Sequence, residues 1–503
     1  MTRLLLTVGA LLFLSLPLRA QFFFNDRCQA TYQSIFRLQF LEANRLLVLE
    51  KQQNPTNLVP VLLENYIDFL TLFIGEEKTQ FHQLEPNKSK RITLLEKGDK
   101  NSPYYNFFLG EVYLQWAFAR IKFGEYASAA IEVRKAYSLF TLNQSRFPDF
   151  IPNNTGLGLV HVIIGIIPEK YQWIKNLMGV NGSVDQGFKE IHQVAGYQGS
   201  DPQIQLFKPE ATFYLALLAA NLQKNQKEAL PILELLERQS SGNQLDQSPL
   251  LIFAQATILL KNGRNDQVLK ILQHRNEEKN KFPFCYLDFL EGVARLNSLD
   301  VNAALCFQRY VHQFKGQNYL RSAYQKLAWI SILKGDTAGF KANMGKVTTV
   351  GEALVDEDKQ ATREAQSGLI PGGILLRARL LFDGGYYDRA LQEILNNPVK
   401  KCIVTRRDFI EYSYRLARIY HELGQYSKAI GYYKQTIQRG KTDPFYFATA
   451  SALQLGLIYE NLSLYKQADS SYRLSLSIPT PEYKSSLNQK AKAGLNRLKK
   501  QQR

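Results

Sequence analysis

The chain has few of the residues that build metal centres, disulfide frameworks or redox thiol sites. Its 503 residues include only four cysteines and six histidines. The cysteines form no Cys-x-x-Cys pair and lie in no cluster with histidine, so zinc and thiol-redox sites are not indicated. The cysteines are Cys28, Cys285, Cys306 and Cys402.

A disulfide between Cys285 and Cys306 is excluded by helix geometry. If the chain turns near Ser298, the two positions differ by about five residues along neighbouring antiparallel helices, or about 7.5 Å. The helices themselves would lie about 8–10 Å apart. Because a disulfide needs Cα atoms within about 7 Å, we predict that these cysteines are buried free thiols.

Sequence motifs of common enzyme classes are also missing. There is no His-Glu-x-x-His, no Gly-x-Ser-x-Gly and no phosphate-binding Gly-x-x-x-x-Gly-Lys-Ser/Thr. Gly156-x-Gly158 lacks the third glycine and the preceding strand of a dinucleotide site. His161 lies in an apolar stretch, which is typical of a core histidine. We predict no catalytic, cofactor-binding or metal-binding residues, no cofactor and no enzyme activity, with a hydrolase of unrecognised site as the remaining alternative.

Long hydrophobic runs are absent after the first twenty residues. Leu58 to Ile74 contains Glu64 and Asp68, and Gly156 to Ile167 is too short to cross a membrane. We therefore predict no transmembrane segment in the mature chain.

Residues 1–20 have the pattern of a secretory signal peptide. Arg3 is followed by the mostly apolar stretch Leu4 to Leu16, and Ala20 supplies a small residue for cleavage. An uncleaved anchor is the alternative, but this stretch would span only about 20 Å as a helix, against roughly 30 Å of hydrocarbon. We predict cleavage after Ala20 and a periplasmic or secreted protein, most simply bacterial.

The chain is basic, with a formal net charge of +17. Residues 483–503 contain basic side chains and no acidic one, which predicts a solvated basic capping helix. Binding of polyanions or membrane by this end is the alternative. Elsewhere both signs are mixed, so nucleic acid is not a predicted partner.

A repeated pattern dominates the C-terminal part of the chain. Leu416, Ala417 and Tyr420 form an apolar helical stripe, Gly424 ends that helix, and Ala429 allows close packing of the next. The Gly-x-Tyr-x-x-Ala pattern at 424–429 recurs at 385–390 and 124–129, and Ala468 follows Ala429 by 39 residues. Weaker copies centre on Ala43, Ala229, Val268, Ala304 and Phe340.

These residues resemble the tetratricopeptide repeat, two antiparallel helices in about 34 residues. One hairpin cannot bury its apolar face alone, so hairpins stack in an array. The named Gly, Ala and Tyr residues are therefore packing residues first, although some aromatics could line a ligand groove.

One segment, 148–208, departs from the repeat. Gly158, His161, Ile167-Pro168, Gly179, Gly182 and Gly187 make its pattern similar to one in a eukaryotic family that includes the inclusion-body clearance proteins and tetratricopeptide repeat protein 39. That family is intracellular, so the resemblance implies architecture alone. The apolar stretch 156–167 is either an internal plug, with Ile164 and Ile167 buried, or a surface for a partner.

We predict an all-α fold, a right-handed α-solenoid of tetratricopeptide-type hairpins with a helical insertion. The expected order is signal peptide 1–20, repeats 21–147, apolar insertion 148–208, repeats 209–347, inserted acidic helix 348–368, repeats 369–482 and basic capping helix 483–503. The predicted function is an exported scaffold that holds a protein or peptide partner in its groove. The alternative is a carrier or sensor of an apolar or anionic small molecule, with the 156–168 hairpin as pocket wall.

Overall fold

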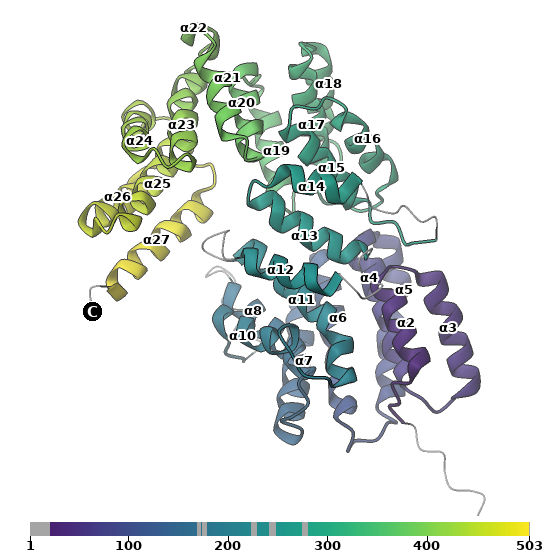
Figure 1. Ribbon diagram of the computed structural model, residues 1–503. Helices are drawn as coiled ribbons and strands as arrows, with labels where there is room; N and C mark the ends of the chain where they lie inside the picture. Colours follow the sequence, from purple (N-terminus) through teal and green to yellow (C-terminus); the bar gives the residue numbers. More distant parts are fainter. Residues whose placement is uncertain are drawn as a thin grey trace, which may run out of the picture. The chain divides into compact units, whose positions relative to one another are not determined.

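The computed structural model describes residues 21–167, 173, 179–222, 229–240, 248–273 and 280–501. The predicted signal peptide, residues 1–20, lies outside them, as does Pro168. Apart from one isolated bridge between Gln21 and Asn57, the regular structure of these described ranges is helical (Figure 1). The predicted all-α fold is confirmed.

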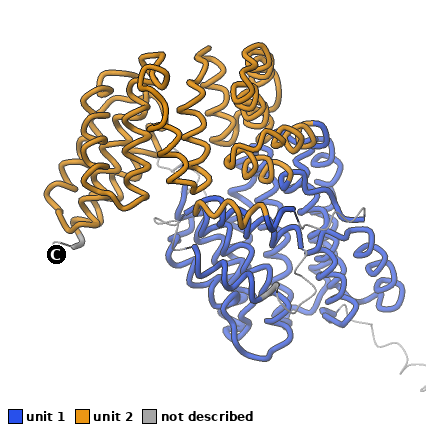
Figure 2. Tube along the Cα trace, turned by 45° about the horizontal axis from the view of Figure 1, so that its top comes forward, with its two compact units in different colours: residues 1–261, 270–287, 312–317 blue, residues 262–269, 288–311, 318–503 orange. Residues whose placement is uncertain are grey.

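The chain divides into two compact units (Figure 2). Unit 1 contains residues 1–261, 270–287 and 312–317, and unit 2 contains residues 262–269, 288–311 and 318–503. Three helices have residues in both units: α14 (Asn265–Gln273), α15 (Tyr286–Asn297) and α16 (Ala303–Gln313).

Unit 1 is a series of helices in which neighbours along the chain pack in pairs, such as α2 with α3 and α6 with α7. Helices α4 and α5 pack on each other as a further pair in the predicted repeat region 21–147. The helices of this unit are α2 (Asp26–Phe36), α3 (Phe40–Gln53), α4 (Val59–Gly75), α5 (Lys78–Leu95), α6 (Pro103–Lys122), α7 (Tyr126–Arg146), α8 (Asn153–Ile166), α10 (Val184–Ala195), α11 (Pro202–Leu222), α12 (Leu230–Ser240) and α13 (Pro249–Lys261).

Most of the apolar stretch 156–167 is buried, as expected if it is an internal plug and not a partner surface. Helix α8 packs between α7 and α10, and a Cβ on Gly187 would lie 2.3 Å from the carbonyl oxygen of Gly158. Ile164 is only 2% exposed, as predicted. Ile167 is only half-buried, contrary to the prediction, and Ile166 is 46% exposed.

Unit 2 continues the hairpin series and ends in a single helix. The acidic helix predicted within 348–368 is α19, and the predicted capping helix is α27, which packs on α25 and α26. The helices are α17 (Leu320–Leu333), α18 (Thr337–Val347), α19 (Asp356–Ser367), α20 (Gly373–Asp383), α21 (Tyr387–Leu395), α22 (Val399–Cys402), α23 (Arg406–Glu422), α24 (Tyr426–Gly440), α25 (Phe447–Asn461), α26 (Tyr465–Ser477) and α27 (Lys484–Gln501).

The small and aromatic residues of the repeat pattern form the core of unit 2. Ala429 and Ala468 are fully buried, as are Tyr433 and Tyr472 four residues later. The same spacing identifies Ala303 and Phe307 as the buried pair of α16. The prediction that Ala304 holds this position was wrong by one residue, because Ala304 is only half-buried.

The four cysteines form no disulfide, as predicted for Cys285 and Cys306. Cys28, Cys306 and Cys402 are buried, whereas Cys285 is only partly so, because it precedes α15 instead of lying within it. Burial raises the pKa of the Cys306 thiol to about 11. Low thiolate content makes such a thiol inert.

Candidate functional site: a cavity in unit 2

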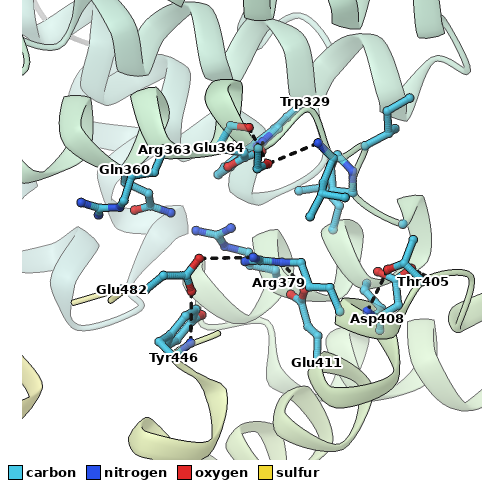
Figure 3. Close-up of a pocket in the computed structure, with 18 of the residues that line it drawn as sticks. Trp329, Gln360, Arg363, Glu364, Arg379, Thr405, Asp408, Glu411, Tyr446 and Glu482 are labelled. Atoms are coloured by element: carbon cyan, nitrogen blue, oxygen red, sulfur yellow. Dashed lines mark hydrogen bonds and ion pairs between the residues drawn. The ribbon is translucent and has the colours of Figure 1, made fainter. Parts of the chain in front are cut away.

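The cavity lies along the first helices of successive hairpins in unit 2. These helices contact one another in the order α17, α20, α23, α25, α27. The cavity has about 840 Å³ of space, counting the part open to solvent, and its lining comes from α17, α19, α20 and α23 and from residues just before α25 and α27 (Figure 3).

The inserted helix α19 forms one wall because it is held on α17. Asp358 is buried and accepts hydrogen bonds from the backbone N–H groups of Tyr319 (2.6 Å) and Ser322 (2.8 Å). Burial raises the pKa of Asp358 to about 6. Six residues further on, Glu364 accepts from the Trp329 indole at 2.7 Å and from Gln325 at 2.6 Å.

The opposite wall begins at the start of α23. Thr405 and Asp408 form a capping box, with the Asp408 N–H donating to the Thr405 hydroxyl at 3.1 Å and the Thr405 N–H donating to Asp408 at 2.9 Å. This cap fixes where α23 begins. Arg407 and Glu411, one turn apart on the helix, therefore line the cavity from a fixed position.

Glu411 is ionised within this wall. Burial by itself would raise its pKa, but the guanidinium groups of Arg415, Arg407 and Arg379 outweigh burial and lower it. Arg415 donates to Glu411 at 2.6 Å. Glu482 accepts from the Tyr446 backbone N–H at 3.1 Å and from Arg407 at 3.4 Å. The lining carboxylates are thus held by donors of the protein itself.

All three arginines of the lining contact aromatic rings, and for Arg379 and Arg363 the ring belongs to the lining too. The guanidinium carbon of Arg379 lies 4.7 Å from the centre of the Trp329 ring, and that of Arg363 lies 5.2 Å from the centre of the Tyr483 ring. Lys326 lies 4.1 Å from the Trp329 ring centre. Its burial and the charge of Arg379 lower the pKa of Lys326 to about 8. The cavity therefore combines flat aromatic surface with cationic donors, an arrangement suited to polar and charged groups of a ligand.

A second polar cluster is buried inside unit 1. Glu210 on α11 accepts hydrogen bonds from the hydroxyls of Tyr32 (2.5 Å) and Tyr66 (3.0 Å). Burial raises its pKa to about 7, and burial together with Glu210 raises the pKa of Glu111. An adjoining space of about 300 Å³ is lined almost entirely by apolar and aromatic side chains. These groups satisfy one another, so the cluster is part of the core.

The sequence analysis predicted no site residues. The residues that line the cavity were not assigned a function from the sequence. His161, predicted to be a core histidine, is buried with its Nδ1 2.6 Å from Glu190. The signals that could have located the cavity were the inserted acidic helix and the Gly-Leu-Ile-Pro-Gly-Gly turn after it. Leu369, Ile370, Pro371 and Gly372 of that turn line the cavity.

Two stretches of unit 2 match family models, each described as a tetratricopeptide repeat. The first match covers residues 413–445 and the second residues 450–479. They correspond to most of the α23–α24 hairpin and to the α25–α26 hairpin. These stretches are tetratricopeptide repeats.

The tetratricopeptide repeats adjoin the cavity. Glu411 precedes the first matched range by two residues, and Tyr446 lies between the two ranges. The same Gly, Tyr and Ala pattern extends to the α20–α21 hairpin upstream, whose Ala390 is fully buried like Ala429. The predicted repeat architecture is confirmed for this region.

Three solved structures are similar to the chain at low identity. Yeast Tom70 is 12% identical, with 86% of this chain and 96% of that chain covered and a TM-score of 0.23. In the Cut9–Hcn1 complex of the APC/C, the matched chain is 13% identical, with 97% and 98% covered and a TM-score of 0.24. In the Naa15/Naa10 complex with HypK, the matched chain is 12% identical, with 94% and 78% covered and a TM-score of 0.23. At these TM-scores none of them informs the choice of a partner. No curated protein matches the sequence.

No described helix combines the length and apolar character needed to span a membrane. Within the same ranges, the His, Cys, Asp and Glu side chains form no group of three that could hold a metal ion.

Proposed function

We propose that this protein is a non-enzymatic scaffold whose unit 2 binds a segment of a partner protein in the cavity. The observation behind the proposal is where the cavity lies, along the adjoining first helices of the α17, α20 and α23 hairpins. Tetratricopeptide scaffolds typically bind proteins. A cavity with aromatic rings and fixed charges along several helices suits an extended peptide, which offers side chains at regular spacing.

The proposed location is the bacterial cell envelope, after export and removal of residues 1–20. The support is the basic start, apolar core and Ala20 of the N-terminal sequence. The resemblance of residues 158–187 to the inclusion-body clearance family stays a prediction, and no intracellular role is transferred from it.

The alternative of a small-molecule carrier lacks support from the 156–168 segment. A Cβ on Gly156 would lie 2.4 Å from the Phe140 ring, and one on Gly158 would lie 2.7 Å from the carbonyl of Gly187. The described part of this segment is therefore filled by packing against α7 and α10. An apolar ligand there would have to displace core side chains.

Site-specific crosslinking tests the proposed function. A photoreactive phenylalanine analogue replaces Leu369, which is 38% exposed and lines the cavity. The control position is Leu395, which is 50% exposed at the end of α21 and outside the cavity. In the native cell, we expect discrete crosslinked proteins from position 369 and none of these from position 395. The same products from both positions, or none from either, would contradict the proposal.

A further inference from the structure

The charged groups of the cavity differ in how far they are already satisfied. Each carboxylate that lines the cavity already accepts two hydrogen bonds from other groups of the protein. Glu364 accepts from Trp329 and Gln325, and Asp408 accepts from two backbone N–H groups. Glu411 accepts two bonds from Arg415, and Glu482 accepts one each from Arg407 and the Tyr446 backbone. A cationic ligand would therefore have to break existing contacts to reach a carboxylate.

Two guanidinium groups of the lining are not satisfied in this way. Arg379 has Asp383 as its ion-pair partner, at 3.8 Å from Nε, which is too long for a hydrogen bond. Arg363 forms no ion pair with a described residue and contacts the neutral ring and hydroxyl of Tyr483. Each guanidinium has five N–H donors, so most of this donor capacity is available to a ligand.

The aromatic rings fix how these donors are presented. Trp329 is buried, and its indole N–H is anchored on Glu364, so the ring beneath Arg379 is held in place. In Figure 3, Arg379 lies between the side of the cavity with Trp329 and Glu364 and the side with Glu482 and Tyr446. A guanidinium held against a fixed ring loses little side-chain entropy when it donates hydrogen bonds to a planar anion. Two N–H groups on one edge of the guanidinium can donate parallel hydrogen bonds to the two oxygens of a carboxylate.

The electrostatic surroundings keep Arg379 charged. Lys326 and Arg379 contact the same Trp329 ring. Burial and Arg415 disfavour the charge on Arg379, but Asp383, Tyr446 and Glu364 favour it, and the pKa of Arg379 is raised overall. A guanidinium that stays charged can pair with a bound anion.

We infer that Arg363 and Arg379 form an anion subsite that takes the carboxylate of an Asp or Glu side chain in the bound peptide. The inference rests on the proposed function and specifies its partner, which is an acidic segment of protein. The available donors, the fixed rings behind them and the open cavity in front together define this subsite.

Peptide selection tests the subsite even though the natural partner is unidentified. The probe is a phage-displayed library of random peptides, selected on residues 21–503 of the wild-type protein. We expect the enriched peptides to share at least one Asp or Glu. Replacing that residue with Asn or Gln should weaken binding by about tenfold to hundredfold, the usual range for hydrogen bonds to a charged group.

Matched protein variants assign the effect to the two arginines. Arg379→Gln and Arg363→Gln should each weaken the acidic peptide and have little effect on its amide version. Arg389→Gln is the control, because Arg389 also lies over a tyrosine ring, that of Tyr386, but does not line the cavity. If Arg379→Gln does not fold, Arg363→Gln still tests the subsite, since Arg363 is exposed.

The outcomes separate the two proposals. Enriched peptides without acidic residues, bound equally by the wild type and both arginine variants, would overturn the anion subsite and leave the scaffold function standing. A library that yields no peptide above background would count against the scaffold function itself. If millimolar inorganic phosphate, or a phosphoserine in place of the acidic residue, bound far better than the carboxylate, the assignment to Asp and Glu would be wrong.

Discussion

Glu210 and Glu111 show how a few polar residues are tolerated in the core of unit 1. Neither carboxylate has an ion-pair partner among the described residues, and tyrosine hydroxyls and Gln115 provide the hydrogen bonds. Without a nearby cation, burial favours the neutral form of a carboxyl group. The pair therefore holds a proton at a pH where an exposed glutamate has lost it.

This cluster predicts that unit 1 becomes less stable as pH rises. The pKa of Glu210 moves from an ordinary value of 4.5 to about 7 on folding. Between these values the folded state binds more protons than the unfolded state, so its stability falls with increasing pH. The contribution is fully present below pH 4.5 and is lost as pH rises through about 7.

Urea unfolding at pH 5 and pH 8 measures the effect. In a Trp329→Phe background, the remaining tryptophans, Trp116 and Trp173, both lie in unit 1, so fluorescence reports on that unit. We expect Glu210→Gln to reduce the loss of stability between the two pH values. The exposed control Glu96→Gln should leave it unchanged. An identical pH dependence in wild type and Glu210→Gln would show that Glu210 is ionised at both pH values.

At the scale of elements, the hairpins are joined by aromatic rings wedged between glycines. Tyr472 of α26 lies between Gly456 of α25 and Gly494 of α27, where an added Cβ would lie 2.4 Å and 2.5 Å from its ring. Phe140 of α7 lies in the same way between Gly110 of α6 and Gly156 of α8. A ring held on two sides cannot move aside for a new methyl group.

We therefore predict that Gly456→Ala destabilises the C-terminal repeats by about 1–3 kcal/mol through overpacking. Gly431→Ala in α24 is the matched control, because nothing lies within 4 Å of a Cβ there. Alanine favours a helix more than glycine does, so this control should stabilise by roughly 0.5–1 kcal/mol. Thermal melting followed by circular dichroism compares the two variants. Shifts of the melting temperature with the same sign would contradict the tight packing of the Tyr472 ring against Gly456.

Helix α8 offers a second test with neighbouring positions. Ile164→Asp places an unpaired charge in the core and should prevent stable folding of unit 1. Ile166→Asp changes a side chain that is already 46% exposed and should be tolerated. Soluble yield and thermal melting measure both. A folded Ile164→Asp protein would show that α8 is a partner surface and not a plug.

At the scale of the whole molecule, the proposed export would decide which partners the protein can meet. We predict that protein isolated from its native cell begins at Gln21, because Ala20 ends the signal pattern. N-terminal sequencing or mass spectrometry of the intact chain measures this directly. Recovery of protein that retains Met1 would remove the envelope assignment, although the crosslinking and peptide tests of unit 2 would still apply.

The sequence by itself determined the helices, the repeat and its packing residues. Tyr420, Gly424 and Ala429 could be assigned from the chain because a helical hairpin is local, and its stop signal and small contact residue recur at a fixed spacing. The prediction for the weaker copy at Ala304 was wrong by one residue. No clear Gly stop precedes this copy, so its register depends on which alanine packs against the neighbouring helix, and that alanine is Ala303.

Only the tertiary structure decided where a ligand could bind. The cavity joins Trp329, Arg363, Arg379, Glu411 and Glu482, which come from five separate segments over about 150 residues. No local sequence pattern links these residues. Helix α19 is an insertion between repeats, and it is held on α17 by hydrogen bonds to Asp358 and Glu364. The free donors of Arg363 and Arg379 follow from those contacts, since the same arginines on an isolated helix would be indistinguishable from ordinary solvated charges.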